Sequence, residues 1–120
     1  MNSKAMYLVK NTVTAPMENS PVIEIANVKL DFESREVRID DREIGLTVME
    51  FDLLGYLAAN RARAVSRKEL LKEVWGFENV VETRATDDMI KRLRKKLEHA
   101  GSQLKITTVW GYGFKIEISL

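Results

Sequence analysis

The feature that most constrains the fold of this chain is the segment from Thr83 to Leu97, TRATDDMIKRLRKKL. If the segment is helical, with about 100° of rotation per residue, it has one narrow apolar stripe, formed by Thr86, Ile90, Leu93 and Leu97. The rest of its surface is strongly basic, because residues 91–96 contain five Lys or Arg side chains and no acid. Such a helix can bury its stripe in a core while its cationic face meets a polyanion. The segment therefore predicts a helix that recognises DNA.

Other uses of a basic amphipathic helix are open at this point. Most charged helix faces contact only solvent and bind no partner. The same pattern is also typical of helices that lie on a membrane or in the groove of a partner protein. The membrane interpretation is weak, because the apolar stripe has no Trp or Phe to settle among lipid headgroups. The distribution of charge favours a polyanion: residues 18–60 carry a net charge of −6 and residues 61–120 a net charge of +5. This division orients the molecule with its acidic half away from DNA.

The composition predicts one ordinary domain and excludes several kinds of site. The chain has 120 residues, 45% of them hydrophobic, and no cysteine, which excludes disulfides and thiolate metal ligands. It has no apolar run near the roughly 20 residues that span a bilayer, and no pattern typical of a signal peptide, so we expect a cytoplasmic protein. One histidine and six dispersed glycines do not supply a nucleophile–base pair, a phosphate-cradling loop or a metal cluster. We therefore expect no enzyme activity and no cofactor, and we interpret His99 as a surface residue or a complement to a helix dipole.

The N-terminal part divides into an irregular segment and a series of short strands. Residues 1–21 show no sustained period and are interpreted as a flexible arm or a linker remnant, whereas residues 22–120 are expected to form the folded domain. Hydrophobic residues alternate from residue 22 to residue 46, and polar breaks at Asn27, Glu33–Ser34 and Asp40–Asp41 predict turns. The pattern predicts a four-stranded antiparallel sheet, apolar on one side and acidic on the other.

Two capping boxes predict the starts of two helices. In Thr47-Val-Met-Glu50 and in Ser66-Arg-Lys-Glu69, the hydroxyl and the carboxylate can satisfy each other's backbone donors. The first helix is expected to bury Val48 on its apolar face. The sequence thus predicts helices over residues 48–59 and 67–75, followed by the third helix over residues 83–98.

The C-terminal segment KITTVWGYGFKIEISL predicts a β-hairpin over residues 105–118. Hydrophobic residues alternate on both sides of Gly111 and Gly113, which mark the turn. The tip carries Trp110, which has little core to reach, and Tyr112, which either packs against the domain or contacts a partner. A leading sheet, three helices and a hairpin predict an α+β winged helix-turn-helix fold, with the third helix in the major groove of DNA and the hairpin as its wing.

Four motifs of the chain together resemble one family. They are LTVMEFDLLGYL, VSRKELLKEVWG, VETRATDDMIKRLRKKL and TTVWGYGFKI. Over about residues 22–118 the chain resembles the DNA-binding effector domain of the OmpR/PhoB family of bacterial response regulators. The resemblance implies a two-component transcription regulator in which a receiver domain precedes the effector domain. It also implies direct-repeat half-sites in double-stranded DNA, bound by head-to-tail pairs.

The resemblance assigns roles to individual residues. The position of Arg92 reaches base edges in the family, with Lys91 and Asp88 beside it, and an Arg can pair with guanine O6 and N7. The other residues expected to contact DNA, from the resemblance or from their place on the cationic face and the hairpin tip, are Arg67, Trp75, Arg84, Arg94, Lys95, Thr108, Trp110 and Tyr112. For Trp75, packing against the third helix is the alternative. The loop through which relatives contact RNA polymerase corresponds to Phe77, Glu78, Asn79, Val80 and Val81.

Two positions depart from the family pattern. Trp110 occupies a wing position that often holds Arg, so charged insertion into a narrow minor groove is not expected here. Asp88 stands where many relatives have an apolar or neutral residue. Its carboxylate repels phosphate but accepts a hydrogen bond from cytosine N4, which makes Asp88 a candidate for base specificity; the alternative is stabilisation of the helix dipole.

A winged helix can also serve as a protein-interaction module without DNA, because a fold does not by itself fix a function. The discriminating feature is the cationic face of the third helix. An interaction module does not need four cations together on that face, Arg84, Lys91, Arg92 and Lys95. This module is the alternative to DNA binding.

Overall fold

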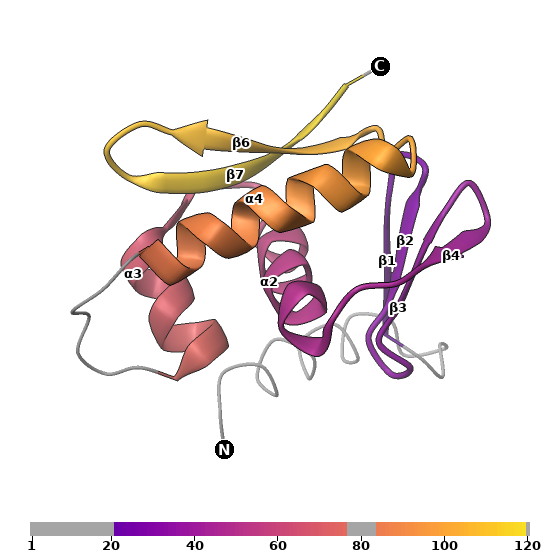
Figure 1. Ribbon diagram of the computed structural model, residues 1–120, viewed down its shortest axis with the longest axis horizontal. Helices are drawn as coiled ribbons and strands as arrows, with labels where there is room; N and C mark the ends of the chain where they lie inside the picture. Colours follow the sequence, from indigo (N-terminus) through magenta and orange to yellow (C-terminus); the bar gives the residue numbers. More distant parts are fainter. Residues whose placement is uncertain (1–20, 77–83, 120) are drawn as a thin grey trace.

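The computed structural model describes residues 21–76 and 84–119. Within these ranges the elements are β1 (Val22–Ile25), β2 (Val28–Asp31), β3 (Glu36–Ile39), β4 (Arg42–Ile44), α2 (Val48–Ala59), β5 (Val65–Ser66), α3 (Arg67–Leu70), η1 (Leu71–Trp75), α4 (Arg84–His99), β6 (Leu104–Val109) and β7 (Gly113–Ile118). In Figure 1, α4 crosses the molecule between the β6–β7 hairpin and α2, with the sheet of β1 to β4 at one end and α3 at the other. The predicted α+β fold, with a leading sheet, three helices and a closing hairpin, is confirmed.

The first sheet is antiparallel with its strands in chain order, β1-β2-β3-β4, as the alternation predicts. Its inner face belongs to the core and is formed by Ile23, Ile25, Val28, Leu30, Val37 and Ile39. The β3–β4 turn holds Asp40 and Asp41 at φ of 52° and 67°. Two consecutive positive φ angles are typical of a tight hairpin turn whose twist matches that of the strands.

The outer face of this sheet has more acids than bases, as the sequence predicts, although two bases lie among them. The strand register places Lys29 beside Glu24 on β1 and beside Arg38 on β3. Arg38 is in turn paired with Glu43 on β4. This row across the sheet therefore has an acid at each end and two bases between them. Elsewhere on the face Asp31 lies opposite Glu36, so four acids and two bases share it.

Helix α2 lies at the centre of the core and begins as its capping box predicts. Thr47 Oγ1 accepts from the Glu50 amide at 3.1 Å, and Glu50 Oε1 accepts from the Thr47 amide at 2.9 Å. Val48, expected to be buried, is instead 60% exposed. Its position in the first turn explains the difference, because the turns that follow, from Glu50 to Ala58, are buried on every side.

The carboxylate of Glu50 is buried, with 3% of the side chain exposed, and it binds Lys96 of α4 at 2.7 Å. Burial by itself raises the pKa of Glu50, but hydrogen bonds from Lys96 and from the Thr47 backbone outweigh it and hold the pKa below the ordinary value of 4.5. The pair therefore favours the ionised carboxylate and ties the start of α2 to the last turns of α4.

We expect the Lys96→Met substitution to lower the free energy of unfolding by about 2 kcal/mol at neutral pH, because it leaves a buried carboxylate unpaired. The loss is smaller than for a fully buried pair, since 40% of the Lys96 side chain is exposed. Because the folded pKa of Glu50 is lowered, the contribution of the pair is present above the unfolded value and is lost as the pH falls through the folded one. Urea unfolding at pH 7 and at about pH 3 measures both effects.

The matched control is Lys95→Met, which changes an exposed neighbour on the same helix. We expect it to alter the unfolding free energy by less than about 0.5 kcal/mol. Equal losses for the two variants at pH 7 would show that the Glu50 pair adds nothing specific to stability.

The second helix begins at a cap of a different kind from the one predicted. Ser66 Oγ accepts from the Glu69 amide at 3.0 Å, as expected. The carboxylate of Glu69, however, binds Arg63 at 2.6 Å and accepts from the Tyr56 hydroxyl. These contacts lower the pKa of Glu69, with the Arg63 hydrogen bond as the largest cause. The predicted helix over residues 67–75 divides into α3 and a π-helical turn, η1, which ends at Gly76 with φ of 84°.

A side-chain bridge fixes the first sheet against the end of α4. Asn27, in the β1–β2 turn, donates to the Gly101 carbonyl at 2.9 Å and accepts from the Gln103 amide at 2.8 Å. These two groups belong to the segment that joins α4 to β6. The position of the sheet relative to the third helix is therefore set by hydrogen bonds as well as by the shared core.

The second sheet has three strands in the order β5-β7-β6, one more than the predicted hairpin. The added strand, β5, pairs Val65 with Phe114 and Ser66 with Gly113. It lies directly before α3, so it joins the hairpin to the second helix. The hairpin itself consists of two antiparallel strands, as predicted, with Ile106 opposite Ile116.

Candidate nucleic-acid interface

Helix α4 is oriented as its apolar stripe predicts. Ile90, Leu93 and Leu97 are each at most 2% exposed and lie in the core, against α2 and β6. The side chains exposed on the other face include Asp88, Lys91, Arg92 and Lys95. The helix therefore buries its apolar stripe in the core and exposes three cations, with Asp88 among them, on the opposite face.

Not all five cations of residues 91–96 belong to that exposed face. Lys96 is turned toward Glu50, and Arg94 is turned toward the wing, the β6–β7 hairpin. The exposed cations are thus Lys91, Arg92 and Lys95. A helical wheel alone does not separate these two groups, because the partners of Arg94 and Lys96 lie on other elements.

Arg67, at the start of α3, is part of a cluster rather than a free cation. Its Nε donates to Asp87 of α4 at 2.8 Å, and its guanidinium lies 4.8 Å from the centre of the Phe114 ring on β7. The contacts of Arg67 with Asp87 and Phe114 were not predicted from the sequence. The three residues lie on three different elements, so no local sequence pattern indicates that they meet.

Arg94 makes two hydrogen bonds to β6. Its Nε donates to the Ile106 carbonyl at 2.7 Å, and Nη2 donates to Thr108 Oγ1 at 2.8 Å. Its guanidinium also lies 5.8 Å from the centre of the Phe114 ring. Desolvation by these neighbours lowers the pKa of Arg94. Two residues predicted to contact phosphate, Arg94 and Thr108, therefore contact each other.

The tip of the wing is aromatic and exposed. Trp110 is 89% exposed and Tyr112 50% exposed, on either side of Gly111 with φ of 75°. The turn is closed by a hydrogen bond from the Tyr112 amide to the Val109 carbonyl at 2.9 Å. Trp75, by contrast, is partly buried against the core, which agrees with the packing alternative for that residue.

Several predicted contacts lie outside the described part of the chain. These are the side chain of Arg84 and the predicted polymerase-contact loop, Phe77, Glu78, Asn79, Val80 and Val81. The described helices include none that is long and apolar enough to cross a membrane. Nor do residues 21–76 and 84–119 contain a cluster of His, Cys, Asp and Glu side chains that could hold a metal ion.

Comparison with known proteins identifies the family. Residues 41–116 match the family described as "Transcriptional regulatory protein, C terminal". The chain belongs to this family. The chain is also similar to the transcriptional regulatory protein SrrA of Staphylococcus aureus, with 37% identity over 118 residues. That match covers 92% of the chain and 49% of SrrA, so the chain spans about half the length of this relative.

Two solved structures are similar to this chain in fold. The DNA-binding domain of Klebsiella pneumoniae RstA, solved in complex with the RstA box, is 29% identical with a TM-score of 0.71, over 82% of this chain and 96% of that one. DrrB of Thermotoga maritima, an OmpR/PhoB homologue, is 27% identical with a TM-score of 0.71, over 97% of this chain and 51% of that one. The OmpR/PhoB resemblance of the four motifs is therefore confirmed.

Proposed function

We propose that residues 22–120 bind double-stranded DNA sequence-specifically, as the effector domain of a bacterial response regulator. The observation that supports this best is the exposed face of α4, where Lys91, Arg92 and Lys95 stand over a buried apolar stripe. The RstA domain, which shares this fold, is bound to DNA in its solved structure. A major groove about 12 Å wide admits one α-helix, and α4 exposes three cations along one face.

In this proposal the exposed residues of α4 read bases. Arg92 donates two hydrogen bonds to guanine O6 and N7, which is the commonest specific contact of an arginine in the major groove. Lys91 lies beside it, and Asp88 accepts from cytosine N4. Lys95 and Arg84 neutralise phosphates of the DNA backbone, and they add affinity without sequence preference.

The flanking elements are proposed to hold the DNA backbone. The Nε of Arg67 donates to Asp87, and its terminal nitrogens donate to no other side chain or carbonyl within residues 21–76 and 84–119, so they can donate to a phosphate. Trp75 is a further candidate, although it is partly packed, whereas Arg94 already has two acceptors on β6. On the wing, Thr108 faces phosphate, while Trp110 and Tyr112 pack against sugar and backbone at the minor groove.

A salt titration tests the proposal against a protein-interaction module. For a DNA-binding protein, the logarithm of the affinity for duplex DNA falls linearly with the logarithm of the salt concentration, by about 0.9 per phosphate contact. With four or more such contacts, we expect binding to weaken at least about a hundredfold between 50 and 200 mM salt. No measurable binding, or binding indifferent to salt, would favour the interaction module.

Asp88→Ala is expected to relax base preference while overall affinity stays equal or becomes tighter. The substitution removes an acceptor for cytosine N4 and also removes a negative charge that repels phosphate. Affinities for duplexes that differ at single base pairs of the preferred site measure both effects. A large loss that is uniform across sequences would instead indicate that Asp88 stabilises the N-terminal turn of α4.

The remaining partners follow from the same proposal. A receiver domain upstream of the effector domain would account for the half of SrrA that this chain does not span. Two domains are proposed to bind head-to-tail on direct-repeat half-sites, and residues 77–81 to contact RNA polymerase. A regulator of this kind acts in the bacterial cytoplasm, where the chromosome lies.

A further inference from the structure

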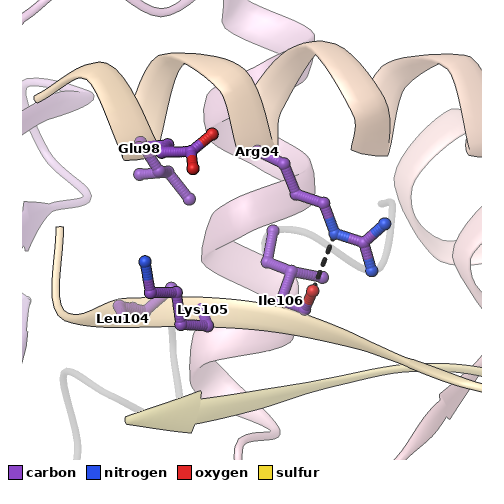
Figure 2. A pocket seen from close by; sticks show the side chains of 6 residues that line it. Arg94, Glu98, Leu104, Lys105 and Ile106 are labelled. Atoms are coloured by element: carbon purple, nitrogen blue, oxygen red, sulfur yellow. Dashed lines mark hydrogen bonds between the residues drawn. The ribbon is translucent and has the colours of Figure 1, made fainter. Parts of the chain in front are cut away.

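Arg94 connects the third helix to the wing by hydrogen bonds. Figure 2 shows its side chain extending from α4 toward β6, with the bond from Nε to the Ile106 carbonyl drawn as a dashed line. The second bond, from Nη2 to Thr108 Oγ1, reaches the next residue on the same side of the strand. One guanidinium therefore holds both a backbone and a side-chain acceptor of β6.

In the hydrogen bond between Arg94 and Thr108, the donor and the acceptor cannot exchange roles. A guanidinium carries only donors, so the Thr108 hydroxyl must accept from Arg94, and its own proton must point elsewhere. Within residues 21–76 and 84–119, this hydroxyl has no acceptor for its proton. Thr108 is only partly buried. Its proton is thus free to donate to an acceptor outside the domain, such as a phosphate oxygen.

The space beside Arg94 is not filled by packed side chains. A pocket of about 180 Å³ lies between α4 and β6, lined by Arg94, Leu97, Glu98, Leu104, Lys105 and Ile106. Figure 2 shows these side chains around the opening, with Arg94 at one end of it. Close packing between α4 and β6 is interrupted at this pocket, and the hydrogen bonds of Arg94 link the two elements beside it.

The second strand of the wing is held at the same point. Phe114 on β7 lies opposite Thr108 in the strand register, and the guanidinium of Arg94 lies over its ring. Arg67 lies over the same ring and is bound to Asp87 of α4. Arg94 is thereby placed at the junction of both wing strands with the third helix.

We propose that Arg94 is a positioning residue of the DNA interface: it fixes the wing to α4 and orients the Thr108 hydroxyl toward phosphate, and it does not itself bind phosphate. This inference rests on the proposed function. It separates two residues that the sequence placed in one class, since Thr108 donates to the DNA and Arg94 sets the direction of that donor.

The charge-retaining variant Arg94→Lys tests the inference most sharply. A lysine keeps the positive charge but has one compact ammonium group in place of the planar guanidinium. It therefore does not bind both acceptors on β6. If Arg94 acts through its geometry, Arg94→Lys and Arg94→Gln should each weaken binding to duplex DNA about tenfold. The slope of affinity against salt should stay at the wild-type value in both. Wild-type affinity for Arg94→Lys, or a slope lower by about 0.9 for Arg94→Gln, would overturn the inference.

A double-mutant cycle with Thr108→Val tests the orientation of the hydroxyl. Thr108→Val alone should weaken binding about tenfold, and adding it to Arg94→Gln should cause little further loss, because the two residues act as one unit. Independent losses, about a hundredfold for the double variant, would contradict the coupling. If Arg94→Gln does not fold, Arg94→Lys completes the same cycle.

A measurement without DNA separates failure of this inference from failure of the proposed function. The chain has two tryptophans, so in a Trp75→Phe background Trp110 reports the wing tip alone. We expect Arg94→Lys to lower the fluorescence anisotropy of Trp110 in the free protein, because the wing loses an anchor. An unchanged anisotropy would refute the anchoring role, whatever the DNA titration gives. Absence of DNA binding by the wild type, with the anisotropy change present, would refute the proposed function but not the anchor.

Discussion

The Arg92→Ala variant is expected to bind the preferred duplex about 1–3 kcal/mol more weakly than the wild type and to lose discrimination at one base pair. Arg92 is exposed on α4, next to the buried Leu93, so its loss removes contacts to DNA without disturbing the core. Affinities for duplexes that carry each of the four bases at every position of the preferred site measure the effect. The loss should be concentrated at a guanine.

The matched control is Lys95→Ala, which removes another exposed cation of the same helix. As a proposed phosphate contact, it should weaken all sequences alike and lower the salt slope by about 0.9. If Arg92→Ala also weakens all sequences alike, Arg92 binds phosphate and does not read a base.

The Gly113→Ala variant is expected to lower the free energy of unfolding by about 3 kcal/mol, at the upper end of the cost of overpacking. A Cβ at this position would lie 1.9 Å from the carbonyl oxygen of Val65 on β5. The close neighbours belong to backbone, so relief requires β5 and β7 to separate. Thermal unfolding followed by circular dichroism should show the melting temperature lowered by more than about 10 °C.

Gly45→Ala provides the control for this substitution. A Cβ at Gly45 meets no atom within 4 Å, so the change should alter stability by less than about 0.5 kcal/mol. A similar loss for the two variants would indicate a general effect of removing glycine, and the close approach of β5 to β7 would not explain it.

The parts of the fold that were predicted from the sequence are those with local causes. Alternation of hydrophobic residues predicted β1 to β4, and the box formed by Thr47 and Glu50 predicted the start of α2 at Val48. The apolar stripe of α4 predicted its orientation, because Ile90 and Leu93 lie on the same face in any regular helix. In each case a few neighbouring residues carry the whole signal.

The parts that were not predicted depend on contacts between distant segments. Strand β5 has only two residues, and its pairing with Phe114 and Gly113 is not encoded near Val65. The environment of Arg94 is set by Ile106 and Thr108, which no property of the helix reveals. The exposure of Lys91, Arg92 and Lys95 on α4 was therefore predictable from the sequence, whereas the division between exposed and hydrogen-bonded cations required the packed structure.

Selection from a pool of random duplex DNA, followed by sequencing, tests the proposed function most directly. We expect the wild-type domain to enrich one motif, with copies arranged as direct repeats about one helical turn apart. Enrichment of that motif should depend on Arg92 and the other exposed cations of α4. Recovery of no motif from the wild type, under conditions where the domain is folded, would contradict sequence-specific DNA binding.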